Sequence, residues 1–241
     1  MNNNIDAIFI QSQRKELESN RLYNFLQKNY RILNSAGVPI YIFFDHGSQD
    51  LINKISDFRS LFKKMVFIID NKYENPTTYC FRFLMNYRHE EHPRVILLET
   101  DCALKTGFIE TLNKDLNKIK NKWYIYGSSY YGKSTFSHIE NPEKKNFYKN
   151  HMNGVAVYNR SNDFVSTVNK CFNDIKADYL KLNYDMALYK VMASYNLLNL
   201  NIDSDFILNI SSQGDQKLNY KLLKPYAAIV HSKNSDSINL Y

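Results

Sequence analysis

Glycine, proline and cysteine are scarce in this sequence, and it contains no long apolar run. Its 241 residues include 7 Gly, 5 Pro and 3 Cys. Because no Gly- or Pro-rich linker and no internal repeat divides so short a chain, we expect one compact domain and exclude a repeat architecture. No segment approaches the roughly 18 apolar residues of a membrane span. The beginning, Met1-Asn2-Asn3-Asn4, is not an apolar signal region, so we expect a soluble protein.

The three cysteines, Cys80, Cys102 and Cys171, are odd in number and lack the spacing of metal ligands. They lie in apolar or helical contexts, which favours buried free thiols over a disulfide framework. Free thiols are typical of a reducing compartment. We therefore expect a cytoplasmic protein.

Charge of one sign is in excess, with 31 Lys and Arg against 24 Asp and Glu and a net charge of +7. This balance suits an anionic partner, which includes a nucleotide diphosphate, an acidic glycan, a nucleic acid or an anionic membrane surface. A solvated basic surface explains the same charge equally well. Apolar residues make up 44% of the chain and aromatic residues 15%, so the chain can form a stable core.

Short apolar runs alternate with helical patterns in the first hundred residues, which predicts a parallel sheet with right-handed crossovers. Their richness in Ile, Val and Phe is typical of strands buried on both faces. The predicted strands are Ile5 to Ile10, Pro39 to Phe44, Met65 to Ile69 and Arg94 to Leu98. The helical patterns between them are Leu22, Phe25, Leu26 and Leu33, then Leu51, Ile55, Phe58 and Phe62, then Cys80, Phe81, Leu84 and Tyr87.

After Asp101 the rhythm of strands and helices is less regular. Two helices are predicted, one over Phe164 to Ile175 and one beginning near Asp185. Another helical pattern is formed by Leu104, Phe108, Leu112, Leu116 and Ile119. The predicted strands are Trp123 to Tyr126, Val155 to Tyr158 and Ala227 to Val230.

Polar and acidic residues follow each of the first four predicted strands. Ligands bind at the carboxyl ends of the strands in open parallel sheets. Carboxylates gathered at one edge repel each other unless a cation or a bound ligand compensates them, and Mg²⁺ or Mn²⁺ prefers such oxygen ligands. The residues in these positions are Gln11-Ser12, Asp45-His46-Gly47-Ser48, Asp70-Asn71 and Glu99-Thr100-Asp101.

Several of these segments resemble motifs of the GT-A glycosyltransferases. The segment Ile40-Tyr-Ile-Phe-Phe-Asp45-His-Gly-Ser48 resembles the strand and loop that open their nucleotide site, and Val95-Ile-Leu-Leu-Glu99-Thr-Asp101 resembles their DxD motif. Glu99 replaces the first Asp of that motif, which leaves open whether it contacts the metal, the ribose or neither. The resemblance implies a nucleotide-diphosphate sugar donor, a glycan acceptor and Mn²⁺ or Mg²⁺ as cofactor. It gives no reason to expect a nucleic-acid partner.

Two later segments extend the resemblance. Ile229-Val-His231-Ser-Lys233 is similar to the segment that places a His on the metal and a basic residue near the diphosphate. His151-Met-Asn153-Gly154-Val-Ala-Val-Tyr158 is similar to the strand that approaches the donor sugar. The resemblance therefore assigns metal binding to Asp101 and His231, with Glu99 as a further candidate. His231 can equally be a strand-end histidine, and Gly154 a turn into a core strand.

The remaining site residues are also implied by the resemblance. Asp185 occupies the relative position of the general base in inverting GT-A enzymes, although an Asp at the start of a helix is also a common cap. Asp174 and Asp178 are weaker candidates for the same role. Candidate contacts to the nucleotide are Gln11, Ser12, Arg14, Asp45, Asp70, Arg82, Glu99 and Lys233; for Arg82, we favour an ordinary cation on a helix face.

The fold expected is therefore α/β, of the GT-A type, with a Rossmann-like, mostly parallel central sheet flanked by helices. Residues 1–241 form one domain, with 1–102 as the nucleotide-sugar-binding half and 103–241 as the acceptor-binding half. The chain is also similar to the small single-domain glycosyltransferases of large DNA viruses of the chlorella type, which implies the cytoplasm of a host cell. Alternatives are a non-catalytic glycan- or nucleotide-binding module, a nucleic-acid-binding protein, and a nucleotidyltransferase, although a Gly-rich, Lys-bearing phosphate loop is missing near the first strand.

Overall fold

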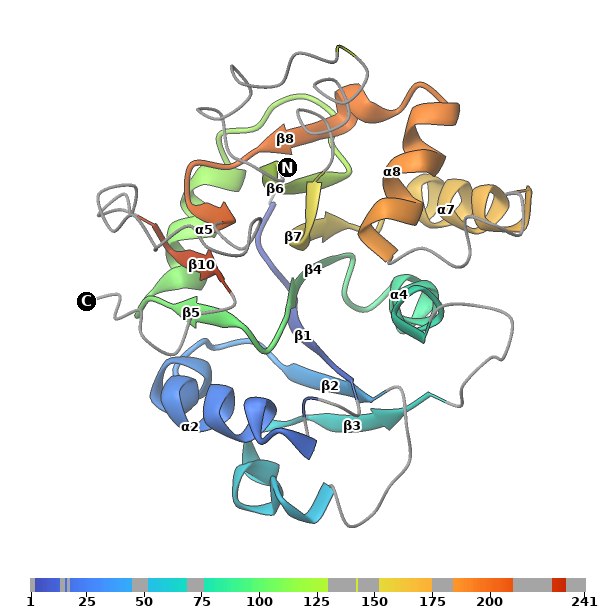
Figure 1. Ribbon diagram of the computed structural model, residues 1–241. Coiled ribbons are helices and arrows are strands. Elements are labelled where there is room, and N and C mark those ends of the chain that lie inside the picture. The colour runs from blue at the N-terminus through green and yellow to red at the C-terminus, as the bar shows by residue number, and fades with distance from the viewer. Residues whose placement is uncertain are drawn as a thin grey trace.

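A seven-stranded sheet forms the centre of the computed structural model, with the strand order β3-β2-β1-β4-β7-β6-β8 (Figure 1). The structure describes residues 3–13, 16, 18–44, 52–68, 76–129, 142, 152–174, 184–209 and 227–232. The strands of this sheet are β1 (Ala7–Ser12), β2 (Ile40–Phe44), β3 (Lys64–Phe67), β4 (Arg94–Leu98), β6 (Ile125–Ser129), β7 (Met152–Asn159) and β8 (Asn201–Asp203).

Strands β3, β2, β1 and β4 run parallel to one another. Strand β7 is antiparallel to both β4 and β6, and β8 is again parallel to β6. The prediction of a mostly parallel central sheet is therefore confirmed. Beside it lies a small sheet in which β10 (Ile229–His231) pairs with β5 (Cys102–Leu104) in antiparallel and with β9 (Ile207–Asn209) in parallel orientation.

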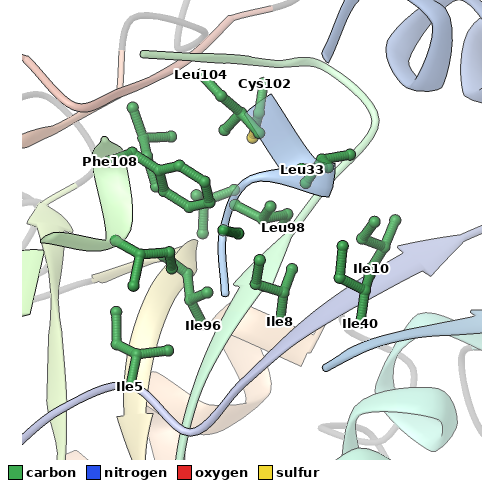
Figure 2. Packing of buried hydrophobic residues seen from close by; sticks show 14 of the residues in the cluster. Ile5, Ile8, Ile10, Leu33, Ile40, Ile96, Leu98, Cys102, Leu104 and Phe108 are labelled. Atoms are coloured by element: carbon green, nitrogen blue, oxygen red, sulfur yellow. The ribbon is translucent and has the colours of Figure 1, made fainter. Parts of the chain in front are cut away.

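Both faces of the central sheet are covered by helices, because its inner strands are apolar on both sides. Ile8 and Ile10 of β1 point to one face, whereas Ala7 and Phe9 point to the other. The first face packs against α2 (Arg21–Asn34) and α5 (Phe108–Leu116), and Figure 2 shows part of this cluster. The second face packs against α4 (Pro76–Asn86), α7 (Asn162–Asp174) and α8 (Tyr184–Ser194).

Several short elements differ from the sequence-based expectation. Leu104, assigned to a helical pattern, lies in β5. The expected helix across the second interval is only a 3₁₀ helix, Ser56–Leu61. Strands β8 and β9 were not expected. Three-residue strands are too short to show a periodic pattern, so they depend on pairing partners that are distant in the sequence.

The prediction of buried free thiols is confirmed for two of the three cysteines. Cys80 and Cys102 are buried free thiols, whereas the side chain of Cys171 lies outside the described residues. Across the described ranges, every helix is too short or too polar to cross a bilayer.

Arg160 is fully buried and joins the end of α4 to the sheet. Its guanidinium donates hydrogen bonds to the carbonyls of Leu84, Tyr87 and His92 at 2.7, 2.8 and 2.5 Å. It also lies 4.8 Å from the centre of the Phe9 ring. Burial lowers the pKa of Arg160 to about 9. The cation therefore satisfies carbonyls that the end of the helix would otherwise leave unpaired.

Replacement of Arg160 by methionine should lower the free energy of unfolding by about 3–5 kcal/mol, because each buried carbonyl left unpaired costs about 1–3 kcal/mol. Urea denaturation monitored by circular dichroism measures this change. Arg59→Met is the matched control, since Arg59 is exposed on the 3₁₀ helix, and it should change the same quantity by less than about 0.5 kcal/mol. Equal effects of the two substitutions would contradict a capping role for Arg160.

Candidate metal and donor site

Glu99, Asp101 and His231 meet at the carboxyl end of β4. Glu99 follows the last residue of β4 directly, and the chain then turns into β5. The antiparallel pairing of β5 with β10 places His231 opposite Cys102, and the Ser232 N–H donates to the Asp101 carbonyl at 2.9 Å. The small sheet therefore brings the end of β10 to Glu99-Thr100-Asp101, the acidic turn between β4 and β5.

The three side chains point toward a common centre. His231 Nε2 lies 2.8 Å from Asp101 Oδ1 and 3.3 Å from Glu99 Oε2, and one ligand atom from each residue lies within 4.8 Å of the others. Among the described residues, buried Asp101 Oδ1 and His231 Nε2 have no hydrogen bond beyond this ion-pair contact, and His231 Nδ1 has no hydrogen-bond partner. Buried polar atoms without partners are costly, and two carboxylates with an imidazole form a donor set that a divalent cation can occupy. The residues therefore fit a divalent cation.

The charges in this cluster strongly shift the pKa of His231. Burial disfavours the imidazolium, but the carboxylates of Asp101 and Glu99 outweigh burial and raise the pKa of His231 to about 10. For Asp101, burial is outweighed in the same way by His231, so the pKa of Asp101 is lowered. Without metal, protonated His231 stabilises the fold through its contacts with the two carboxylates. This contribution is fully present below pH 6.5, the ordinary pKa of histidine, and is lost as the pH rises through the raised pKa of about 10.

Binding of Mn²⁺ should release about one proton per metal ion near neutral pH, because a metal ligates the neutral imidazole. Calorimetric titration of Mn²⁺ in Pipes and in Tris, two buffers with different ionisation enthalpies, measures the number of protons released. The Mn²⁺ affinity should also increase with pH until His231 is neutral. Identical binding enthalpies in both buffers would show that His231 does not lose a proton to the metal.

Glu16 contacts the acidic turn through a hydrogen bond to Thr100. It was not among the site residues predicted from the sequence. Its Oε1 accepts a hydrogen bond from Thr100 Oγ1 at 2.8 Å, and its Oε2 accepts one from the Gln13 N–H at 2.7 Å. Burial raises the pKa of Glu16 to about 7. Thr100 is the middle residue of the acidic triplet, so Glu16 orients the backbone between the two acids. A single Glu in a polar stretch carries no sequence signal for this contact with a residue 84 positions away.

Tyr184, the first residue of α8, contacts Glu99 directly. Its hydroxyl donates to Glu99 Oε1 at 2.5 Å. Burial, followed by the charge of Glu99, raises the pKa of Tyr184 well above its ordinary value, so the phenol remains a donor. Gly154 of β7 lies beside this hydroxyl, and a Cβ at Gly154 would lie 1.7 Å from it. The pattern in the sequence predicted a helix beginning near Asp185 and gave Tyr184 no role in the site.

Other candidate residues lie on several elements around this centre. Gln11 and Ser12 are buried at the end of β1. Arg82 donates to Asn173 Oδ1 at 3.3 Å and lies 5.5 Å from the Phe172 ring centre, so it contacts α7. Four of the predicted site residues, Arg14, Asp45, Asp70 and Lys233, lie outside the described residues, as does the side chain of Asn153.

Asp185 lies in the first turn of α8, next to Tyr184. Its Oδ1 accepts a hydrogen bond from the Met186 N–H at 2.9 Å. Burial raises the pKa of Tyr158 well above its ordinary value, and the charges of Asp185 and Glu99 contribute in the same direction. Asp185 and the acidic turn therefore act on the same buried hydroxyl. The competing residue Asp178 and the side chain of Asp174 lie outside the described residues.

Arg21 adds a cation that the sequence analysis did not single out. It is the exposed first residue of α2. Its positive charge contributes, after burial and His231, to the shift in the pKa of Asp101. Its sequence signal is its position at the start of a helix that follows β1, because such helices begin at the carboxyl edge of the sheet.

Comparison with known proteins identifies the fold. No protein-family model and no curated protein matches by sequence. Three similar solved structures, each with a TM-score of 0.55, are mouse xyloside xylosyltransferase 1 in its apo form, the galactosyltransferase LgtC in complex with donor and acceptor sugar analogues, and the apo form of the glycosyltransferase GlyE of Streptococcus pneumoniae.

Their sequence identities to this chain are 13%, 13% and 14%, and the matches cover 97%, 94% and 95% of it. The same matches cover 99%, 87% and 54% of the other chains, so the chain spans about half of GlyE. These structures are GT-A glycosyltransferases, and the predicted GT-A fold is confirmed.

Proposed function

We propose that this protein is a metal-dependent glycosyltransferase that moves a sugar from a nucleotide-diphosphate donor to a hydroxyl acceptor. A fold alone does not define an activity. The observation that carries the proposal is the cluster of Glu99, Asp101 and His231, whose possible ligand atoms lie within 4.8 Å of one another at the carboxyl edge of a GT-A sheet. We expect the nucleotide of the donor to be UDP. The relationship to the single-domain glycosyltransferases of large DNA viruses stays a prediction.

Asp101 and His231 would hold the cation, with Glu99 as the third ligand through Oε2. Bound there, Mn²⁺ or Mg²⁺ would supply positive charge that neutralises a departing diphosphate. The support for this assignment is the combination of oxygen and imidazole ligands with charges that repel one another when no cation is bound. Arg21 and Lys233 would add further positive charge for the phosphates.

Residues 1–102 would form the half that binds the nucleotide sugar. Strands β1, β2, β3 and β4 all run in the same direction, so the segments that follow them reach the same edge. We assign contacts with the base, ribose and diphosphate to residues at this edge, with Arg82 kept as the weakest candidate. These residues are Gln11, Ser12, Arg14, Asp45, Asp70 and Glu99.

Residues 103–241 would form the half that binds the acceptor, with Asn153 and Gly154 close to the donor sugar. Asp185 would remove the proton from the acceptor hydroxyl. The acceptor oxygen would form a bond to the anomeric carbon as the bond from that carbon to the diphosphate breaks, which inverts the configuration. The hydrogen bond between Tyr184 and Glu99 supports this placement, since it holds the start of α8 against the acidic turn.

Release of nucleoside diphosphate from a panel of sugar nucleotides tests the proposed activity. The panel should include UDP-xylose and UDP-galactose, given the xylosyl- and galactosyltransferases among the structural neighbours, and also UDP-glucose, UDP-N-acetylglucosamine and GDP-mannose. We expect release with Mn²⁺, suppression by a chelator, and acceleration when a matching sugar acceptor is added. Binding of a sugar nucleotide without release under any condition would favour the non-catalytic binding module.

A further inference from the structure

The two oxygens of the Glu99 carboxylate have different surroundings. Oε1 accepts the hydrogen bond of Tyr184, at 2.5 Å, whereas Oε2 lies 3.3 Å from His231 Nε2. The glutamate arm is long enough to reach both groups. Only Oε2 therefore faces the centre shared with Asp101.

The Tyr184 hydroxyl is held in a fixed position. The side chain is buried, and its ring stacks on Phe81 of α4 with centroids 4.9 Å apart and an angle of 21°. The hydroxyl occupies the space that a side chain at Gly154 would fill. A rigid donor of this kind restricts Glu99 more strongly than a flexible surface partner would, because it has little freedom to follow the carboxylate.

We propose that Tyr184 is a positioning residue that keeps Glu99 from binding a cation through both oxygens and so favours Mn²⁺ over Ca²⁺. The inference rests on the proposed metal site and adds a determinant of its specificity. Ca²⁺ takes 6–8 oxygen ligands in flexible geometry and often binds carboxylates through both oxygens, whereas smaller cations prefer about six ligands in octahedral geometry. Two-oxygen binding by Glu99 would require Oε1 to turn toward the cation, and the Tyr184 hydroxyl, held by its stacked ring, resists that rotation through its hydrogen bond to Oε1.

The same contact connects the metal site to the helix that carries Asp185. Tyr184 is the first residue of α8, so a hydrogen bond to Glu99 fixes the start of that helix relative to the acidic turn. Substitution of Tyr184 should therefore have two effects. It should change the metal preference through Glu99, and it should shift Asp185 through the start of α8.

Tyr184→Phe tests the inference, because it removes the hydroxyl and keeps the ring that stacks on Phe81. Mn²⁺ and Ca²⁺ affinities are measured without nucleotide, by electron paramagnetic resonance of free Mn²⁺ and by competition with Ca²⁺. We expect the preference for Mn²⁺ over Ca²⁺ to fall about 10-fold, the lower end of the effects seen when groups that support metal ligands are removed. Gly154→Ala keeps the hydroxyl but pushes it and its ring away from Glu99, because the added Cβ would lie 1.7 Å from the hydroxyl and 2.3 Å from the ring carbon that carries it. It should shift the preference in the same direction and is the second variant if Tyr184→Phe does not fold.

Tyr124→Phe is the matched control. This tyrosine is also buried, and its hydroxyl also donates to a carboxylate, that of Asp163, at 2.9 Å. It precedes β6 beside the start of β4, and so lies at the opposite edge of the sheet from Glu99. Its preference for Mn²⁺ over Ca²⁺ should stay within about twofold of the wild-type value. A wild-type protein that binds Mn²⁺, with an unchanged preference in Tyr184→Phe or an equal shift in Tyr124→Phe, would overturn this inference alone. A wild-type protein without a Mn²⁺ site would overturn the proposed function as well.

Discussion

Replacement of Asp101 by asparagine should lower the rate of sugar transfer by about 10³-fold or more, since a bound metal contributes several kcal/mol to the stabilisation of a departing anion. The amide keeps the size of the side chain but removes its charge from the atom that lies 2.8 Å from His231 Nε2. The expected result includes weaker Mn²⁺ binding, because only Glu99 and His231 would then remain as ligands. Initial rates at several Mn²⁺ concentrations, together with a Mn²⁺ titration, measure both effects.

Asp163→Asn is the matched control for this substitution. Asp163 lies in the first turn of α7, near the end of β7, where Asn159 pairs with Arg94 at the beginning of β4. It therefore lies at the opposite edge of the sheet from Glu99 and forms an ion pair with Lys122. The control should transfer sugar at a rate within about twofold of the wild type, as expected for a distant surface site. An Asp101→Asn enzyme with the same rate and Mn²⁺ dependence as this control would contradict the assigned role of Asp101.

Replacement of Asp185 by asparagine should lower kcat by about 10²–10⁴-fold, the usual contribution of a general base. Affinities for Mn²⁺ and for the donor should change by less than about threefold, because the substitution leaves Glu99, Asp101 and His231 in place. The Oδ1 atom that accepts from the Met186 N–H is retained in asparagine, so the start of α8 should keep its conformation. Donor-binding titrations and initial rates on the same preparation separate the two effects.

The control for Asp185 is Glu110→Gln, which neutralises an acid in the first turn of α5. Acids in this position stabilise helices by about 0.3–1 kcal/mol, so both substitutions should have similar small effects on stability. Only Asp185→Asn should impair turnover. A rate within tenfold of wild type would leave Asp185 as a helix-terminal acid only. Product analysis by NMR would then decide between inversion and retention of the anomeric configuration.

The sequence predicted the elements that carry strong local patterns. The strands β1, β2 and β4 are continuous apolar runs because they are buried on both faces, and α2 shows the spacing of Leu22, Phe25, Leu26 and Leu33 on one side of a helix. Strand β5 was missed, and its Leu104 was assigned to the helix that follows. Its three residues form a strand only because β10, from the far end of the chain, pairs with them.

For the candidate site, the sequence indicated the three possible metal ligands but not the residues that support them. Glu99, Asp101 and His231 follow or end strands, so their positions in the sequence already indicated a common edge. Glu16 and Tyr184 were missed as site residues, because each reaches the acidic turn through a hydrogen bond that spans 84 or 85 positions. Such contacts depend on how α8 and the segment after β1 pack onto the sheet, and a short local pattern does not encode that packing.

The most direct test of the metal-centred donor site is a Mn²⁺ titration followed by electron paramagnetic resonance, carried out with and without UDP or GDP. Glu99, Asp101 and His231 should bind one Mn²⁺, and one of the two nucleotides should tighten this binding by about 10-fold or more, because its diphosphate supplies further oxygen ligands. The same titration of Asp101→Ala should show weak Mn²⁺ binding that neither nucleotide improves. Wild-type protein that leaves all Mn²⁺ free at millimolar concentration, with either nucleotide present, would contradict the proposed donor site.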